Sequence, residues 1–535
     1  MISTYIQQII IDSSLMIILA TGLGIIYGHA GVLSLCHATL YGAGAYMAAL
    51  LFRLIATGSW GLNLIEICLL GLLGGVVASL CIGSLCLKLR GDFVALATIA
   101  FGELARALVL NADFLGGARG IRGIQHITTP SAAIFVAVLA VIAARFILQS
   151  PWGRMMEAVR DNTMLADGLA VPVQKARLSA FVFGGGLAGI AGALFAFKQQ
   201  YIHPSSFDIM ASITILLAVI LGGRGNLTGY IIGALIISIG AESLRLLPGS
   251  ADWRAMGMGA VLLITSWFFT KGILGKWPYT DPVRRSFFWG TSRKSSVIEG
   301  LSQKDRIRIL KTRNIKVSTE QTTIIDGISL ILKSGISVAL IGPNGSGKST
   351  LAKALAGDIP SLGKIELDDV PLCVYPRHVE IKRKIIQLPQ HPNGFHRMNA
   401  LDNVRLPIDR DFRRSPVFSW LPYAGRNHSI RSERAAMNAL KQVGLADKAD
   451  HIFSTLSYGQ RKRTLLAAAM LADPLVLILD EPFAGLNTGP GSESEIITDA
   501  LQPRLKAPDR ITIIIDHRIE LLKPICKEVI LMDAG

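Results

Sequence analysis

The chain has 535 residues, of which 51% are hydrophobic and 17% charged, and its formal net charge is +16. This apolar content excludes a disordered polyelectrolyte, and six cysteines in such a length exclude a small disulfide-stabilised scaffold. At about 150 residues per domain, the length allows two to four domains. Soluble globular proteins carry about 25% charged residues, so the low average indicates one very apolar part joined to one ordinary soluble part.

The distribution of charge separates these two parts. Residues 1–280 contain 17 Lys and Arg and 11 Asp and Glu, whereas residues 281–535 contain 37 and 27. The first part also contains nine apolar segments, most of them near the length of about 20 residues that a spanning helix needs. The expected spans lie at 5–28, 38–56, 64–86, 93–111, 131–148, 178–198, 208–223, 226–248 and 254–270. We therefore predict a polytopic α-helical membrane domain over 1–280, with about eight to ten spans because the seventh is short.

Basic residues predict the orientation of this domain. They gather in the loop containing Lys88, in the loop 149–177, and at Lys271 and Lys276 after the last expected span. Cytoplasmic loops of membrane proteins carry an excess of Lys and Arg. With nine spans these three loops lie on one side, the cytoplasm, and the N-terminus lies outside.

A few polar residues stand inside the apolar segments. Glu103 and Arg106 are three positions apart on one helix, so they either form a structural ion pair or line a translocation path, because charges within a membrane avoid lipid. His29 and His37 flank a turn of small residues, where we expect a packing or hydrogen-bonding role, with a ligand role as the alternative. Glycines over 184–192 predict close helix packing. Four cysteines without metal-ligand spacing are expected to be packing residues: Cys36, Cys68, Cys81 and Cys86.

The segment 281–305 is predicted to be a basic linker. Residues 281–314 carry nine basic against three acidic residues, and the basic ones include Arg284, Arg285, Arg293 and Lys294. Such a stretch is typical of an exposed segment beside a membrane face. A nucleic-acid patch is the alternative, but no base-stacking or groove-reading motif accompanies it, so we expect no nucleic-acid partner.

Residues 306–535 alternate strand-like and helix-like segments, which predicts an α/β domain. The apolar run Ser337–Ile341 indicates a buried strand, and Leu351–Ala356 indicates a helix. Between them lies a phosphate-binding loop in the strand–loop–helix context that such loops require. Its residues are Gly342, Pro343, Asn344, Gly345, Ser346, Gly347, Lys348, Ser349 and Thr350. Glycines let backbone N–H groups surround phosphate oxygens, Lys348 reaches the β- and γ-phosphates, and the Ser349 hydroxyl binds Mg²⁺.

A second buried strand, Leu475–Leu479, ends in two adjacent acids. Asp480 at the strand end is placed to hold Mg²⁺, and Glu481 is placed to polarise the attacking water. The alternative for adjacent acids at a strand end is a solvated turn. The preceding phosphate-binding loop favours the metal and catalytic roles.

The segment Leu456-Ser457-Tyr458-Gly459-Gln460, shortly before these acids, resembles the signature of the nucleotide-binding domain of ABC transporters. In that family two such domains close face to face, which implies that Ser457, Gly459 and Gln460 contact a partner's nucleotide. Gln390 resembles the Q-loop glutamine, which contacts Mg²⁺ and the attacking water. His517 resembles the switch histidine, which contacts the γ-phosphate, and 484–487 resembles the D-loop. The resemblance implies ATP hydrolysis, with ATP and Mg²⁺ as cofactors.

Other features are similar to the branched-chain amino acid uptake group of this family. In the second part they are Tyr458, Asn487 and the insertion 412–432; in the first part they are the segments 28–35, 42–46, 89–93, 100–103, 151–172 and 221–223. The resemblance implies a permease over 1–280 fused to an ATPase over 306–535, in a bacterial inner membrane with the ATPase in the cytoplasm. It implies import of branched-chain or related amino acids. The implied partners are a second permease and a second ATPase in a heteromeric set, an external solute-binding protein and membrane lipid.

The loop 149–177 partly resembles the cytoplasmic coupling loop of ABC importers through Glu157, Ala158, Gly168 and Pro172. A short helix there is expected to dock into the ATPase cleft beside Gln390. The alternative is a plain amphipathic surface loop.

Two further functions and two departures from the family stay open. The cargo could be urea, an amide or another small polar solute, or the chain could be an ATP-gated channel or sensor. No aromatic residue lies at Ile315–Thr319, where many family members stack one on adenine, so either the base is bound more weakly or it uses another contact. The sequence stops at Met532–Gly535, where family members usually continue, after all the ATP-contacting residues named above.

Overall fold

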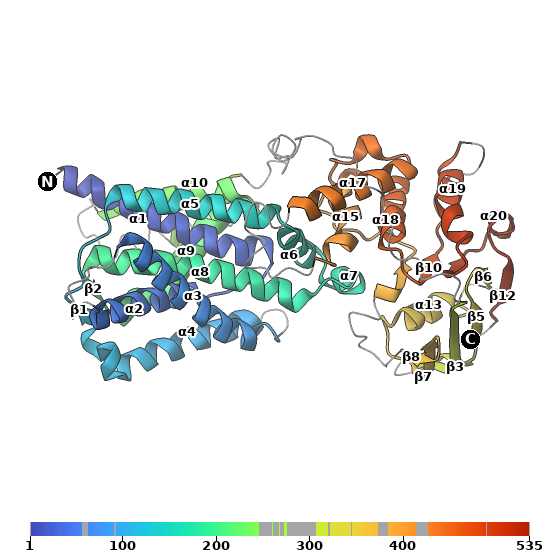
Figure 1. Ribbon diagram of the computed structural model, residues 1–535, viewed down its shortest axis with the longest axis horizontal. Helices are drawn as coiled ribbons and strands as arrows, with labels where there is room; N and C mark the ends of the chain where they lie inside the picture. Colours follow the sequence, from blue (N-terminus) through green and yellow to red (C-terminus); the bar gives the residue numbers. More distant parts are fainter. Residues whose placement is uncertain are drawn as a thin grey trace. The chain divides into compact units, whose positions relative to one another are not determined.

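The structure is a computed structural model that describes most of the chain in two compact units (Figure 1). The described residues are 2–55, 63–89, 93–245, 259–260, 267, 272–274, 307–318, 322–343, 345–372, 383–412, 426–487, 489 and 491–533. The first unit comprises Met1–Arg160, Val173–Tyr279 and Ser415–Ala424, and the second comprises Asp161–Pro172, Thr280–Arg414 and Gly425–Gly535. The expected linker 281–305 lies outside the described residues, as do Asn344, Thr319, 413–425 of the insertion and Arg90–Asp92.

The first unit is built of apolar helices. Its longer helices are α1 (Ile2–Leu23), α2 (His37–Ile55), α3 (Leu64–Cys86), α4 (Phe93–Asn111), α5 (Pro130–Gln149), α6 (Pro151–Asp161), α8 (Val173–Gln199), α9 (Ile209–Gly222) and α10 (Leu227–Arg245). Among the described residues, six helical segments are long and apolar enough to cross a membrane: Tyr5–His29, Leu64–Cys86, Phe93–Asn111, Pro130–Gln149, Val173–Gln199 and Pro204–Gly222. The polytopic helical domain predicted from composition is therefore confirmed.

The helix bounds follow the apolar segments closely. The helices α3 and α4 have the bounds expected from the sequence, while α2 and α10 lie where the second and eighth spans are expected. The short seventh span corresponds to α9, which has 14 residues and follows the 3-10 turn Pro204–Phe207. The expected ninth span, 254–270, lies outside the described residues except for 259, 260 and 267.

Glycines form the seam where α2, α3 and α8 pack together (Figure 1). A Cβ on Gly44 would overlap the backbone of Gly189, and a Cβ on Gly75 would overlap the carbonyl oxygen of Gly185. Lipid tails are as apolar as the helices, so the hydrophobic effect does not drive spans together inside a membrane. The van der Waals contacts of such closely approaching backbones stabilise the packing instead. This confirms the close helix packing predicted for 184–192.

The helix α1 continues into a π-helix, Gly24–His29, which the sequence pattern does not predict. A hydroxyl from α10 stabilises this wide turn: Tyr230 donates to the Gly24 carbonyl at 3.1 Å and accepts from the Gly225 N–H at 2.9 Å. Single π-helical turns within α-helices occur frequently at functional sites. Its last residue, His29, is fully buried.

The helix α6 contacts the end of this π-helix. Glu157 lies 3.3 Å from the His29 Nδ1 atom through its Oε1 atom, and the Arg160 guanidinium donates to the Gly28 carbonyl. The hydrogen-bonding role expected for His29 is therefore confirmed. His37 is also fully buried, and neither of its ring nitrogens has a hydrogen-bond partner among the described residues. The cysteines of this unit are free: Cys36 and Cys86 are buried, Cys68 is half-buried and Cys81 is exposed, so the packing role expected for Cys81 is not seen within this unit.

The second unit is organised around a five-stranded parallel sheet in the order β12-β6-β11-β10-β9. Its strands are β6 (Ser337–Ile341), β9 (Ile385–Leu388), β10 (Val476–Asp480), β11 (Ile511–Ile515) and β12 (Glu528–Leu531). The central three are almost continuously apolar and buried, as expected for parallel strands covered on both faces.

A smaller antiparallel sheet covers one side of this unit, in the order β4-β3-β7-β8 with β5 paired to β3. Its strands are β3 (Ile309–Ser318), β4 (Thr323–Ile328), β5 (Ile331–Lys333), β7 (Leu362–Leu367) and β8 (Val370–Pro371). The helix α13 (Lys348–Ala356) contributes Leu351 and Leu355 to the core that also contains Leu310 of β3 and Ile478 of β10. One apolar core therefore joins both sheets.

Helices complete the second unit. They are α15 (Ala400–Asp409), α17 (Arg426–Gln442), α18 (Tyr458–Ala472), α19 (Glu493–Leu505) and the single turn α20 (Ile519–Leu522). The first three share an apolar core around Val404, Leu440 and Ala468, while α19 and α20 pack with residues of the parallel sheet. The predicted α/β class is thus confirmed.

Candidate functional site

The candidate nucleotide site lies at one edge of the parallel sheet. The strands β6, β9, β10 and β11 run in the same direction, so the loops that follow them emerge at the same edge. In open α/β sheets, ligands bind at this carboxyl edge. The topology thus gathers four segments that are distant in sequence: the phosphate-binding loop, the segment after Leu388, the acids after Leu479 and the segment after Ile515.

The phosphate-binding loop has the backbone geometry that its glycines allow. Gly345 and Gly347 adopt φ values of +87° and +89°, and Gly347 directly precedes α13. A side chain at Gly342 would overlap the Met532 carbonyl oxygen, just beyond β12. Such a loop places several N–H groups and the helix N-terminus around an anion.

Lys348 folds back across this loop. Its ammonium donates to the Gly342 carbonyl at 2.9 Å and to the Pro343 carbonyl at 2.6 Å, and it lies 3.4 Å from the Ser346 hydroxyl. The side chain is buried, so the carbonyl oxygens stabilise a charge that would otherwise be costly there. The cation is therefore held within the loop that is predicted to bind phosphate.

Asp480 and Ser349 meet at the centre of the site. Asp480 is the last residue of β10 and is buried, and burial raises the pKa of its carboxyl group, while a hydrogen bond from the Ser349 side chain opposes that change. The Oδ1 atom of Asp480 is buried without a hydrogen-bond partner among the described residues. A bare buried carboxylate oxygen beside a hydroxyl is a donor set suited to a hard divalent cation.

Glu481 is brought together with Gln390 and His517. Its Oε2 atom accepts a hydrogen bond of 2.6 Å from the Gln390 amide, and its Oε1 atom lies 3.2 Å from the His517 Nε2 atom. Glu481 also has a φ of +48°, a left-handed conformation that non-glycine residues adopt uncommonly and that clusters at functional sites. The three residues singled out as catalytic from the sequence thus form one cluster.

The signature residues form the start of α18. Ser457 and Gln460 make a capping box: the Ser457 hydroxyl accepts from the Gln460 N–H at 3.2 Å, and the Gln460 side chain accepts from the Ser457 N–H at 3.0 Å. The side chain of Gln460 is therefore occupied within its own helix turn. A side chain at Gly459 would overlap the Glu493 carboxylate, and the Tyr458 hydroxyl donates to the Gln390 carbonyl at 3.2 Å. Within the described parts of the chain, no hydrogen bond joins this signature to the phosphate-binding loop.

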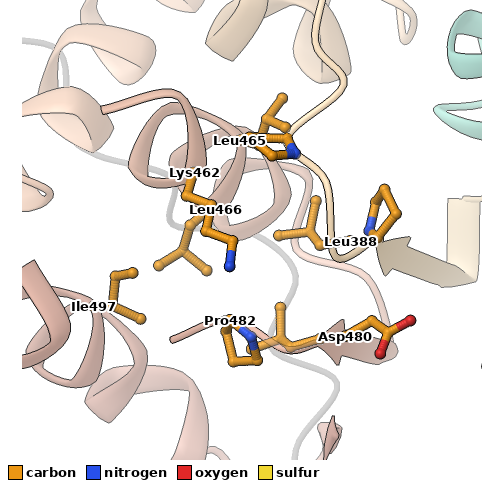
Figure 2. Close-up of a pocket in the computed structure, with 10 residues that line it drawn as sticks. Leu388, Lys462, Leu465, Leu466, Asp480, Pro482 and Ile497 are labelled. Atoms are coloured by element: carbon orange, nitrogen blue, oxygen red, sulfur yellow. The ribbon is translucent and has the colours of Figure 1, made fainter. Parts of the chain in front are cut away.

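The sequence reasoning missed Lys462 and Asp516. The Lys462 ammonium donates to the Glu481 carbonyl at 2.6 Å and to the Ala484 carbonyl at 2.9 Å, and burial lowers the pKa of Lys462 to about 8. It lines a cavity of about 30 Å³ together with residues of β9, β10 and α18 (Figure 2). Asp516 accepts hydrogen bonds from the Phe483 N–H and the Arg518 N–H. The position of Asp516 next to His517 was the available signal.

The loop expected to couple the two parts contains a short helix, α7 (Thr163–Gly168), and residues 161–172 belong to the second unit. Asp161 accepts a hydrogen bond of 3.0 Å from the Arg397 N–H. The Leu169 carbonyl accepts one of 2.7 Å from Arg410. These partners follow Gln390 in the chain, and among the described residues the hydrogen bonds of Gln390 go to Glu481 and Tyr458 rather than to this loop.

Comparisons with known proteins agree with this architecture. A family model described as "Branched-chain amino acid transport system / permease component" matches residues 5–266, and one described as "ABC transporter" matches residues 325–484. The high-affinity branched-chain amino acid transport system permease protein LivM of Escherichia coli is 30% identical over 301 residues, covering 50% of this chain and 68% of LivM. The chain belongs to the branched-chain amino acid ABC transporter family.

The ATPase half of the transporter has relatives of its own. The probable amino-acid import ATP-binding protein YxeO of Bacillus subtilis is 31% identical over 42% of this chain and 86% of YxeO. The lipopolysaccharide export system ATP-binding protein LptB of Escherichia coli is 28% identical over 42% of this chain and 87% of LptB. The transporter is thus a multi-pass membrane protein whose second unit is a cytoplasmic ABC ATPase, which couples ATP hydrolysis to transport.

Proposed function

We propose that the chain is one permease–ATPase half of an importer for branched-chain or related amino acids. The observation that carries the proposal is the union, in one chain, of a LivM-like permease half with an ATPase unit in which Gln390, Glu481 and His517 converge. The name of the permease relative LivM gives amino acid transport without a direction, so import is itself part of the proposal. The ATPase half is similar to both an import protein and an export protein, YxeO and LptB, at nearly equal identity.

The transporter needs further subunits. One chain supplies one permease and one ATPase, and the signature residues Ser457 and Gly459 are not hydrogen-bonded to the chain's own phosphate-binding loop within the described residues. We infer that they contact the nucleotide of a second ATPase. A second permease and an external solute-binding protein complete the set, which we propose to be heteromeric.

The assigned residues divide the hydrolysis of ATP between them. Lys348 exchanges the carbonyl oxygens of Gly342 and Pro343 for the β- and γ-phosphate oxygens of ATP, because a phosphate is the stronger partner for an ammonium. Glu481, held by Gln390 and His517, accepts a proton from the attacking water. His517 has a second role besides orienting Glu481. It contacts the γ-phosphate and stabilises the negative charge that develops there during hydrolysis.

Mg²⁺ fits the residues at the strand end. The buried Oδ1 atom of Asp480 has no partner among the described residues, and the Ser349 hydroxyl lies beside the same carboxylate. These two side chains, with the Gln390 amide, would hold the ion. When bound, it neutralises charge on the phosphate oxygens. Asp480 and Ser349 fix where such an ion can sit, whereas Glu481 is oriented by Gln390 and His517 and can still accept a proton from the attacking water.

The catalytic assignment is tested by Glu481→Gln. We expect steady-state ATP hydrolysis to fall by about 10² to 10⁴-fold, the usual contribution of a general base, while ATP binding is retained. Hydrolysis and nucleotide binding by the purified transporter provide the measurements. Glu520→Gln, which changes an exposed acid three residues after His517, is the matched control and should hydrolyse ATP normally. Normal turnover by the Glu481 variant would refute its role.

The cargo assignment is tested by uptake. The complete transporter, with its partner subunits and solute-binding protein in vesicles, should accumulate labelled leucine, isoleucine or valine against a gradient when ATP is supplied. If the vesicles accumulate urea or an amide but no amino acid, the assignment of an amino-acid cargo is wrong. If the solute moves only down its gradient, the chain is part of an ATP-gated channel and not of an importer.

A further inference from the structure

An ion pair stands in the middle of the membrane-spanning helix α4. Arg106 donates to the Glu103 Oε2 atom through its Nε at 2.9 Å and through its Nη2 at 2.8 Å. Glu103 is the eleventh and Arg106 the fourteenth of the 19 residues of this helix. Both charges therefore lie away from the ends of the span, where long side chains could otherwise reach the water.

The helix leaves this pair accessible. The Glu103 and Arg106 side chains are 45% and 39% exposed. Only 11% of the apolar stretch of α4 is buried, against 33–78% in the other five helices that qualify as spans among the described residues. Figure 1 shows α4 along one edge of the first unit. The pair thus faces a surface that this chain does not cover within its described part.

The pair occupies a different sector of α4 from the exposed leucines. Each residue turns an α-helix by about 100°, so Glu103 and Arg106 are about 60° apart around the axis of α4. The half-buried Ile99 lies between them on this count. Leu104 and Leu108, which are 60% and 59% exposed, lie about 100° to 160° away from the pair on the same count. The helix therefore has one wholly apolar sector suited to lipid or protein, and a separate sector that carries both charges.

Each member of the pair retains hydrogen-bonding capacity. Arg106 uses only its Nε and Nη2 atoms, and Glu103 uses only Oε2, so Nη1 and Oε1 make no hydrogen bond with the described residues. Charged side chains within membranes face water-filled cavities or each other rather than lipid. The pair therefore presents one donor and one acceptor side by side on the part of α4 that the described chain leaves exposed.

We propose that Glu103 and Arg106 contact the two charged ends of the transported amino acid as it crosses the membrane. The free Glu103 oxygen accepts from the α-ammonium group, and the free Arg106 N–H group donates to the α-carboxylate. Leu96, which is 63% exposed and lies two helical turns before Glu103, provides an apolar contact for an aliphatic side chain. The site recognises a zwitterion, which neither urea nor a neutral amide supplies, and this inference rests on the amino-acid cargo proposed above.

The first test measures leucine uptake and ATP hydrolysis by the complete transporter in vesicles. We expect Glu103→Gln and Arg106→Gln each to lower the leucine taken up per ATP hydrolysed by at least about tenfold, since charged partners bind more strongly than neutral ones. The double variant E103Q/R106Q should be at least as impaired as either single variant. A purely structural ion pair predicts the opposite, because removing both charges relieves the unpaired charge that each single variant leaves.

Asp12→Asn is the matched control. It breaks an ion pair that joins two membrane helices, Asp12 with Lys198, and should transport leucine at nearly the wild-type rate. If E103Q and R106Q transport like this control, or if the double variant recovers, the inference is overturned while the amino-acid cargo stands. If the wild-type transporter takes up no amino acid, both proposals fail.

A second test asks whether water and leucine reach the charged sector. The Ile99→Cys variant should react with a water-soluble, negatively charged methanethiosulfonate, and saturating leucine with the solute-binding protein and ATP should slow that reaction. Leu108→Cys, on the apolar sector, should remain unreactive. Mass spectrometry of the labelled peptide separates these positions from the native cysteines. An unreactive thiol in the Ile99→Cys variant, or one that leucine does not protect, would overturn the proposal.

Discussion

Lys462 shows how a single side chain can connect two motifs of the ATPase unit. It lies on α18 directly after the signature, yet its ammonium binds the backbone carbonyls of Glu481 and Ala484. Burial lowers its pKa from 10.5 to about 8, and Asp516, Glu481 and Asp480 partly oppose that effect whereas Arg518 adds to it. Lys462 is therefore placed to fix the backbone that carries the proposed catalytic acid.

We expect Lys462→Met to destabilise the transporter and to slow ATP hydrolysis. The variant leaves two carbonyl oxygens without a donor, at a cost of about 1–3 kcal/mol near neutral pH. In the wild type the unfolded state holds the Lys462 proton up to about pH 10.5, whereas the folded state loses it near pH 8. Since the unfolded state then binds more protons, the folded state is favoured increasingly as pH rises across that window, and the difference in free energy of unfolding between wild type and variant should grow by about 1–3 kcal/mol.

Unfolding of the purified chain in detergent at several pH values measures this difference. Lys441→Met removes an exposed lysine at the end of α17 and should give a difference that does not change with pH. A flat profile for Lys462→Met as well would contradict the argument.

The role of Lys462 could not be predicted from the sequence, unlike the roles of two other residues of the ATPase unit. Lys348 could be assigned a role because it lies in a strand–loop–helix pattern, and Glu481 because it is one of two adjacent acids that follow a buried strand. Lys462 lies between Arg461 and Arg463, so in sequence it has the pattern of a solvated basic run. Its burial depends on carbonyl groups 19 and 22 positions away, whose direction is set by the end of β10.

At the scale of elements, the π-helix Gly24–His29 depends on a side chain from α10. Such a wide turn shifts backbone carbonyls away from their usual partners, and here the Gly24 carbonyl is bound by the Tyr230 hydroxyl. That hydroxyl also holds the Gly225 N–H in the turn before α10. Tyr230 therefore joins the end of α1 to the start of α10 through one oxygen atom.

We expect Tyr230→Phe to lower the thermal unfolding midpoint of the purified chain by a few degrees. Loss of the hydroxyl leaves one donor and one acceptor unpaired, at a cost of about 1–2 kcal/mol for interhelical hydrogen bonds in membranes. Tyr46→Phe is the control, because the Tyr46 hydroxyl is buried without a hydrogen-bond partner among the described residues. Equal midpoints for the two variants would show that the Tyr230 hydroxyl does not stabilise the π-helix.

Elements differed in how well their sequence specified them. The bounds of α3, α4, β6 and β11 follow from uninterrupted apolar runs between polar or glycine-rich breaks. The π-helical turn could not be predicted, because one extra residue hardly changes an apolar pattern, and Tyr230 lies 206 positions from its acceptor. Contacts of that sequence separation are decided by packing rather than by local preference.

At the scale of the whole molecule, we propose that residues 161–172 connect ATP hydrolysis to transport. Helices α6 and α8 flank this segment in the chain and belong mainly to the first unit, yet the segment itself belongs to the second. Asp161 and the Leu169 carbonyl bind Arg397 and Arg410, which lie between Gln390 and the end of the insertion. A displacement of the segment after Gln390 during hydrolysis would therefore pull directly on the chain that leads into α6 and α8.

We expect Arg410→Met to uncouple ATP hydrolysis from transport. The Arg410 side chain is buried, and burial lowers its pKa to about 10, so it remains a cation at neutral pH and donates to the Leu169 carbonyl at 2.7 Å. Methionine keeps much of the apolar stem but donates no hydrogen bond. The variant therefore loses the hydrogen bond that holds residues 161–172 through the Leu169 carbonyl, while the nucleotide site is unchanged. Uptake per ATP hydrolysed in vesicles should fall several-fold, with hydrolysis within about twofold of the wild type, since a charged hydrogen bond contributes about 1.5–3 kcal/mol. Arg434→Met, an exposed position on α17, should leave the ratio unchanged. If Arg410→Met lowers hydrolysis and uptake in proportion, the side chain acts on the ATPase itself and not on its coupling to the membrane helices.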